Sequence, residues 1–84
     1  MSYSNEERNI IYDKTEGHCN ICNKKLSWSN YGNPVGKAPW EVDHSKAIAR
    51  DGTNHLNNLE PVCIDCNRKK GTDTTPSARR KFGQ

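Results

Sequence analysis

This sequence has few apolar residues, few aromatic ones and no long hydrophobic run. Of its 84 residues only 31% are hydrophobic and 7% are aromatic. A core built from so little apolar surface is thin, so something else must help to stabilise the fold. No run is long enough to cross a membrane. No N-terminal apolar segment could direct export, so we expect a soluble, cytoplasmic protein that forms one domain.

The cysteines can supply the missing stabilisation. They form two Cys-x-x-Cys pairs with forty residues between the pairs: Cys19, Cys22, Cys63 and Cys66. Two disulfides are one interpretation, but this spacing is typical of thiolate zinc sites, and nothing directs the chain to an oxidising compartment. We therefore predict one structural Zn²⁺ held by four thiolates. His18 precedes the first pair and is interpreted as a neighbour, because four thiolates already complete a tetrahedron.

Positive charge gathers toward the C-terminus. The net charge is only +3, but from residue 68 onward basic residues far outnumber the one acidic residue. The basic residues in this segment are Arg68, Lys69, Lys70, Arg79, Arg80 and Lys81. A surface of this kind attracts phosphate backbones, which makes these residues candidate nucleic-acid contacts. A solvated tail is the other interpretation, and composition does not distinguish the two.

The first half of the chain predicts a helix and a long loop. Ser4 and Glu7 fit a capping box, so a helix is expected to begin there and to end at Gly17. Residues 26–39 are rich in Asn, Gly, Ser and Pro, which predicts turns. Three aromatic residues in or next to this loop could stack on nucleic-acid bases or belong to the core: Trp28, Tyr31 and Trp40. We favour the core for Trp40.

The second half predicts two strands and a helix. Residues 40–44 (WEVDH) alternate as a short strand would, and residues 59–62 can form a second strand. A helix is expected over residues 64–70, ended by Gly71. The segment 72–84 is expected to be weakly structured, with Phe82 as an anchor. These elements indicate an α+β fold.

Four polar residues in this half suggest chemistry. Asp43 and His44 end the first predicted strand, Asn58 precedes the second, and Asn67 shares one helix face with Lys70. Oxygen and imidazole groups suit a divalent catalytic metal and a base that activates water. Singly, each has a plain structural explanation, such as an ion-pairing acid, a partly buried imidazole, a turn residue or a surface amide. His55, in the same loop region, is a weaker candidate.

Taken together, these residues resemble the HNH endonuclease family, in its cysteine-containing, zinc-knuckle branch. The motifs occur in the family's order: Cys19-x-x-Cys22, Asp43-His44, Gly52-Thr53, Asn58-Leu59 with Pro61, Cys63-x-x-Cys66-Asn67 and Lys70-Gly71. The resemblance covers about residues 19–71. It implies a small ββα-metal (His-Me finger) fold stapled by a four-cysteine zinc knuckle over residues 18–71. An N-terminal helix (1–17) would precede it and a basic tail (72–84) would follow, all within one nuclease domain.

The resemblance also implies roles for individual residues. His44 looks like the general base, Asn58 looks like the residue that orients it, and Asp43 and Asn67 look like the ligands of a catalytic divalent metal. Asn67 stands where many members have His, so this chain is an H-N-N variant. Its oxygen-rich ligand set favours Mg²⁺ or Mn²⁺ over Ni²⁺ or Zn²⁺. Asp51-Gly52 replaces the paired glycines of relatives, which affects only the expected loop conformation.

The function that this resemblance implies is metal-dependent hydrolysis of DNA phosphodiester bonds, with double-stranded DNA as the partner. The other interpretation is a zinc-knuckle module that binds DNA without cutting it, or an accessory protein in phage DNA packaging or defence. An intact set of Asp43, His44 and Asn67 favours the nuclease, because a pure binder has no need of it. The sequence leaves open a homodimer or a larger phage or bacterial complex, in a bacterial or phage-infected cell.

Overall fold

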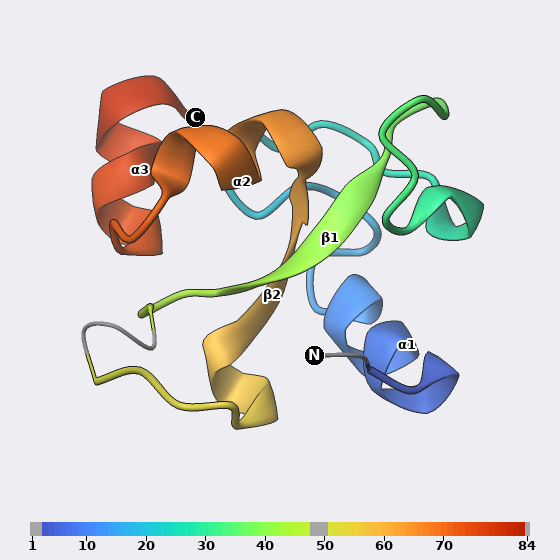
Figure 1. The fold of residues 1–84 in the computed structure, drawn as a ribbon, viewed down its shortest axis with the longest axis horizontal. Helices are drawn as coiled ribbons and strands as arrows, with labels where there is room; N and C mark the ends of the chain where they lie inside the picture. Colours follow the sequence, from blue (N-terminus) through green and yellow to red (C-terminus); the bar gives the residue numbers. More distant parts are fainter. Residues whose placement is uncertain (1–2, 48–50, 84) are drawn as a thin grey trace.

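A two-stranded ribbon with helices packed around it forms the fold (Figure 1). The computed structural model describes residues 3–47 and 51–83. In chain order the elements are α1 (Asn5–Asp13), a 3-10 turn (Trp28–Asn30), β1 (Trp40–His44), a second 3-10 turn (Leu56–Asn58), β2 (Leu59–Cys63), α2 (Ile64–Lys70) and α3 (Thr75–Phe82). The strands are antiparallel, with Trp40 opposite Cys63 and His44 opposite Leu59. The strand–strand–helix order confirms the predicted ββα-metal class of fold.

The N-terminal helix begins where the capping box predicts. The Ser4 amide donates to Glu7 Oε1 at 2.9 Å, and the Glu7 amide donates to Ser4 Oγ at 3.1 Å. The helix proper ends at Asp13, and the following turns run to Gly17, whose φ is +79° and whose amide donates to the Tyr12 carbonyl. Ile11 is fully buried. The capping box therefore sets the start of α1, and Ile11 attaches the helix to the rest of the chain.

The core is small, and sulfur contributes much of it. Its buried members are Cys19, Ile21, Leu26, Trp40, Val62, Cys63, Cys66 and Ala78. Trp40 is the largest fully buried side chain, as expected, and the rings of Tyr12 and Tyr31 lie 5.2 and 4.9 Å from it. Trp28 packs on the outside of this group and is 36% exposed. None of the helices described is long and apolar enough to cross a membrane.

The C-terminal segment is a helix, so the expectation of a weakly structured tail was wrong. Thr74 caps α3 by accepting from the Ser77 amide, and a proline follows in the first turn. Ala78 is fully buried, and Phe82 packs against the core as expected. Arg79 donates from Nε and Nη2 to the carbonyl and side-chain oxygens of Asn20, at 2.8 Å each. The helix is therefore docked on the loop that holds the first cysteine pair.

We predict that Ala78→Asn destabilises the fold by about 2–4 kcal/mol, because the new side chain is too large for its site and brings an unpaired polar group into the core. Arg80→Asn, two residues on and exposed, is the matched control and should cost less than about 0.5 kcal/mol. Urea denaturation of zinc-loaded protein measures both. Equal, small losses would mean that α3 is not part of the cooperative fold.

Candidate functional site

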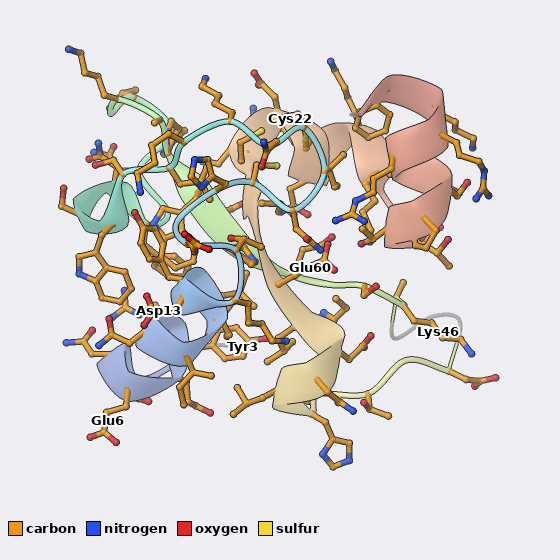
Figure 2. All side chains as sticks on the ribbon, turned by 180° about the vertical axis from the view of Figure 1, so that it is seen from behind. Tyr3, Glu6, Asp13, Cys22, Lys46 and Glu60 are labelled. Carbon is orange, nitrogen blue, oxygen red and sulfur yellow. The ribbon has the colours of Figure 1, made fainter. Side chains whose placement is uncertain are left out.

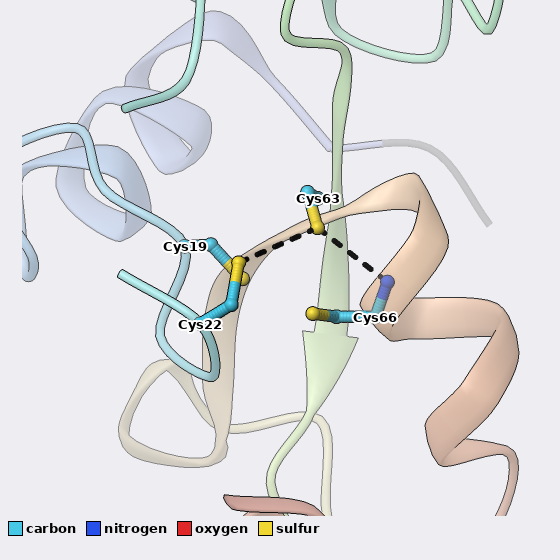
Figure 3. Close-up of side chains that lie close together, drawn as sticks. All are labelled: Cys19, Cys22, Cys63 and Cys66. Carbon is cyan, nitrogen blue, oxygen red and sulfur yellow. Dashed lines mark hydrogen bonds between the residues drawn. The ribbon is translucent and has the colours of Figure 1, made fainter. Parts of the chain in front are cut away.

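The four cysteines, which come from distant parts of the chain, meet in one cluster (Figure 3). Their sulfur atoms all lie within 4.8 Å of one another, and Cys22 Sγ lies 3.9 Å from Cys63 Sγ. All four are free thiols. A disulfide requires about 2.05 Å between its sulfurs, whereas a tetrahedron with Zn–S bonds of about 2.3 Å has S–S edges of about 3.8 Å. The cluster therefore has the dimensions of a metal site.

Two backbone features bring these thiols together: a tight turn around the first pair and the junction of a strand and a helix at the second. Asn23 takes a left-handed conformation (φ +65°), and its amide donates to the Cys19 carbonyl, which closes a tight turn around the first pair. The second pair lies at the junction of β2 and α2. Cys63 caps α2, with its sulfur accepting from the Cys66 amide at 3.4 Å. The amide of Ile21 approaches Cys19 Sγ in the same way. These donors stabilise negative charge on sulfur.

The four thiols of the cluster differ in how readily they lose a proton. Hydrogen bonding from the Cys63 thiol lowers the pKa of Cys19 to about 4, and the same contact raises the pKa of Cys63. Burial raises the pKa of Cys66 to about 12. Without a cation only part of the set can ionise, because thiolates this close repel one another. A bound Zn²⁺ would let all four deprotonate, so the residues fit the metal.

A second polar centre lies between β1 and α2. Glu41 and Asp43 both face α2, because alternate residues of a strand point to one side. Asn67 Nδ2 donates to Glu41 Oε1 at 2.9 Å. Lys70 Nζ lies 2.9 Å from Asp43 Oδ2 and donates to the His44 carbonyl at 2.8 Å. Two neighbouring contacts, Glu41–Asn67 and Asp43–Lys70, thus join the strand to the helix.

The Asp43 carboxylate is already paired with a positively charged group. Its side chain is only 13% exposed and that of Lys70 is fully buried. Within the described ranges, Asp43 Oδ2 has no directed hydrogen bond, although the Lys70 ammonium is close. The environment thus already favours positive charge at this oxygen. The Asp43 carboxylate and the amide of Asn67, which contacts Glu41 on the same strand, offer oxygen donors of the kind that a hard divalent cation prefers.

His44 ends β1 and contacts a residue that the sequence did not single out. Its Nε2 lies 2.7 Å from Asn54 Oδ1, in the loop between the strands. With the amide oxygen as acceptor, Nε2 carries the proton and Nδ1 keeps a lone pair. In that arrangement the Nδ1 lone pair is the one that remains to accept a proton. The only sequence signal for Asn54 was its place in a polar loop.

Asn58 contacts the backbone of the same loop. Its Oδ1 accepts from the Lys46 amide at 2.9 Å, and its Nδ2 donates to the carbonyls of Lys46 and Thr53 at 3.0 and 2.7 Å. These bonds join the two sides of the loop that carries Asn54; residues 48–50 lie outside the described part of the chain. The structure places the Asn58 amide on the loop backbone and the Asn54 amide on the imidazole. His55 is exposed.

Glu60 is a buried carboxylate that the sequence did not reveal as a site residue. It stands opposite Asp43 in the strand pairing, and Thr75 Oγ1 donates to its Oε2 at 2.5 Å. In Figure 2 it lies on the side of the ribbon toward α3. Burial raises its pKa, and the Thr75 hydrogen bond offsets part of that shift. Glu60 thus adds negative charge beside the Asp43–Lys70 pair and connects the start of α3 to β2.

The six basic residues of the C-terminal third have different surroundings. Lys70 is buried against Asp43, and the Arg79 guanidinium is bound to Asn20. Lys81 pairs with Asp73 at 2.8 Å, and Lys69 Nζ lies 5.7 Å from the Phe82 ring. The remaining two, Arg68 and Arg80, are exposed. Lys70 and Arg79 therefore act within the fold, and the surface available to phosphate is smaller than the sequence suggested.

A strand–strand–helix unit with a four-thiol cluster able to bind a metal defines a small metal-binding α+β domain of the ββα-metal type. The family model for the HNH endonuclease matches residues 19–73, and the chain belongs to that family. The match spans all four cysteines, both strands and α2. No curated protein matches the chain. Membership implies a nuclease-type function and metal binding.

We predict one tightly bound Zn²⁺ per chain, because four converging thiols in so small a core would be unstable without a cation. Cys19→Ser should abolish zinc binding and cooperative folding. His18→Ser, next in sequence but outside the thiol cluster, should keep both. Elemental analysis and thermal unfolding measure the two effects. Zinc-free protein that unfolds cooperatively, or two intact disulfides, would contradict the assignment.

Proposed function

We propose that this chain is a metal-dependent endonuclease that hydrolyses DNA phosphodiester bonds. The observation that carries the proposal is the contact between His44 Nε2 and Asn54, at the end of the strand that also presents Asp43 to α2. Family membership adds the reaction class. In this proposal His44 is the general base, and Asp43 and Asn67 hold a divalent metal. The chain acts as one domain that includes both α1 and α3.

Phosphodiester hydrolysis needs a water in line with the leaving oxygen, a base of near-neutral pKa and positive charge at the phosphoryl oxygens. His44 Nδ1 accepts the proton of the attacking water, and the bond from Nε2 to Asn54 keeps the ring oriented as the charge develops. Asn58 holds the loop that supports Asn54. The metal, when bound, supplies Lewis-acid stabilisation of the transition state. Oxygen ligands favour Mg²⁺ or Mn²⁺ over Ni²⁺ or Zn²⁺.

The contact between Asp43 and Lys70 supports a second candidate function. An ammonium group 2.9 Å from a proposed metal ligand could replace the metal in a domain that binds DNA without cutting it. Such a chain would serve as a zinc-knuckle binding module or as an accessory in DNA packaging or defence. The His44–Asn54 contact favours the nuclease, because a module that only binds DNA has no need of an oriented imidazole.

The Asp43–Lys70 pair also decides which variants are informative. Removing the Asp43 carboxylate leaves the buried Lys70 ammonium without its partner, which costs about 3–5 kcal/mol. Asp43→Ala therefore tests folding as much as metal binding. Asn67→Ala leaves that pair intact and is the cleaner probe of the proposed metal site.

We predict that zinc-loaded protein nicks or linearises plasmid DNA with Mg²⁺ or Mn²⁺, and that His44→Ala lowers the rate by about 10²- to 10⁴-fold, the usual contribution of a general base. His55→Ala, an exposed histidine near the same loop, is the control and should change the rate only a few-fold. Gel assays with Mg²⁺, Mn²⁺, Ni²⁺ and Zn²⁺ give the rates. DNA binding without cleavage under all four metals would favour the second candidate.

We also propose that the basic C-terminal residues contact DNA phosphates, with the exposed Arg68 and Arg80 contributing most to the measured charge effect. In a His44→Ala background, replacing both by Ala should reduce the slope of log affinity against log salt by about 1.8, at about 0.9 per phosphate contact on duplex DNA. Affinity should fall alike for unrelated sequences. Lys37→Ala, an exposed cation in the loop before β1, is the charge control. An unchanged slope would mean that α2 and α3 face away from DNA.

A further inference from the structure

The side chain of Asn67 has a single hydrogen bond among the described residues, and it uses the nitrogen end of the amide. Asn67 Nδ2 donates to Glu41 Oε1 at 2.9 Å. Both side chains are half-buried. Glu41 lies two residues before Asp43 on the same face of β1, so this bond is next to the Asp43–Lys70 pair. Nothing in the sequence alone assigned a role to Glu41.

The chemistry of a primary amide makes this bond consequential. An amide binds a hard cation through its oxygen, but its two ends have nearly the same shape, so an unrestrained asparagine can present either one. An ionised carboxylate only accepts hydrogen bonds. Glu41 therefore selects the nitrogen of Asn67 and leaves Oδ1 without a competing donor.

We propose that Glu41 is a positioning residue that holds the Asn67 amide with its oxygen free for the metal. The inference rests on the proposed function, in which Asn67 is a ligand of the catalytic metal. Glu41 acts through Asn67 and is not itself a ligand. A neutral amide is a weaker metal ligand than an imidazole or a carboxylate. The bond to Glu41 would compensate for this by holding the amide oxygen of Asn67 ready to bind the metal. Loss of the partner of a metal ligand typically costs 10–100-fold in metal affinity.

The experiment is a titration of zinc-loaded protein with Mn²⁺, followed by the loss of the free-ion electron paramagnetic resonance signal, so that it does not depend on cleavage. Glu41→Ala should weaken Mn²⁺ binding by about 10–100-fold. Glu41→Gln has both an accepting oxygen and a donating nitrogen and cannot select one end of the Asn67 amide, so it should also weaken Mn²⁺ binding, although less than Glu41→Ala. Asp65→Asn removes an exposed carboxylate from α2 and should leave the affinity unchanged. Zinc content and urea midpoints verify that each variant is folded.

The outcomes separate this inference from the function on which it rests. If Asn67→Ala abolishes Mn²⁺ binding and Glu41→Ala does not weaken it, the positioning role is wrong and the metal site stands. If Glu41→Gln binds Mn²⁺ as tightly as the original chain, an acceptor-only partner is not what orients the Asn67 amide, and the inference is also overturned. If Asn67→Ala binds Mn²⁺ as well as the original chain, the proposed ligand set itself is wrong.

A double variant tests the same hydrogen bond with the amide and the carboxylate exchanged between positions 41 and 67. In Glu41→Gln/Asn67→Asp the amide is on the strand and the carboxylate is on the helix, so Gln can donate to Asp and leave a carboxylate oxygen free. This double variant should bind Mn²⁺ at least as tightly as Glu41→Gln alone. Weaker binding would show that the orientation of residue 67 does not control the site.

Discussion

The geometry of this protein depends on the convergence of four thiols at the junction of β2 and α2. Cys63 is at once the last residue of β2, the N-cap of α2 and a member of the cluster. The position of the cluster therefore sets the direction in which α2 leaves the ribbon. Asn67 follows Cys63 by about one helical turn, and Lys70 by about two. The thiol cluster thereby places the polar side chains of α2 opposite β1, although no thiol takes part in the proposed chemistry.

Charged side chains are buried inside this fold, although the composition of the chain suggests that they would lie on its surface. Lys70 is buried between Asp43 and the His44 carbonyl, and Glu60 is buried beside them. Burying such groups is unfavourable unless they are paired, so each must keep its partner. The end of β1 is therefore held by electrostatic contacts where a larger domain would use apolar packing.

Local features of the sequence predicted most of the fold. The capping box at Ser4, the paired cysteines and the alternation before His44 each depend on neighbouring residues, and the structure confirms them. The helix α3 was missed because its only fully buried hydrophobic side chain is Ala78, too small to give a visible apolar stripe, and because its charges suggested a solvated tail. Its Thr74 cap and the proline after it were the available signals.

Contacts between distant residues could not be predicted in the same way. Asn54 and Asn58 lie four residues apart in one loop, and only the path of that loop determines which amide meets His44. Lys70 looked like a surface cation, since nothing nearby in the sequence shows that Asp43 lies opposite. The Glu41–Asn67 bond joins residues on two different elements. The residue types at the candidate site were thus predictable, but their partners were not.

The pairing of Trp40 with Cys63 across the ribbon gives the chain an internal optical reporter. Trp40 is fully buried, whereas Trp28, 5.8 Å away, is partly open to solvent. The two indoles should therefore emit at different wavelengths in the folded, metal-loaded state. Loss of a metal ion bound by the thiol cluster would loosen the strand opposite Trp40 and shift its emission to the red. Intrinsic fluorescence can thus follow the state of the thiol cluster without any added label.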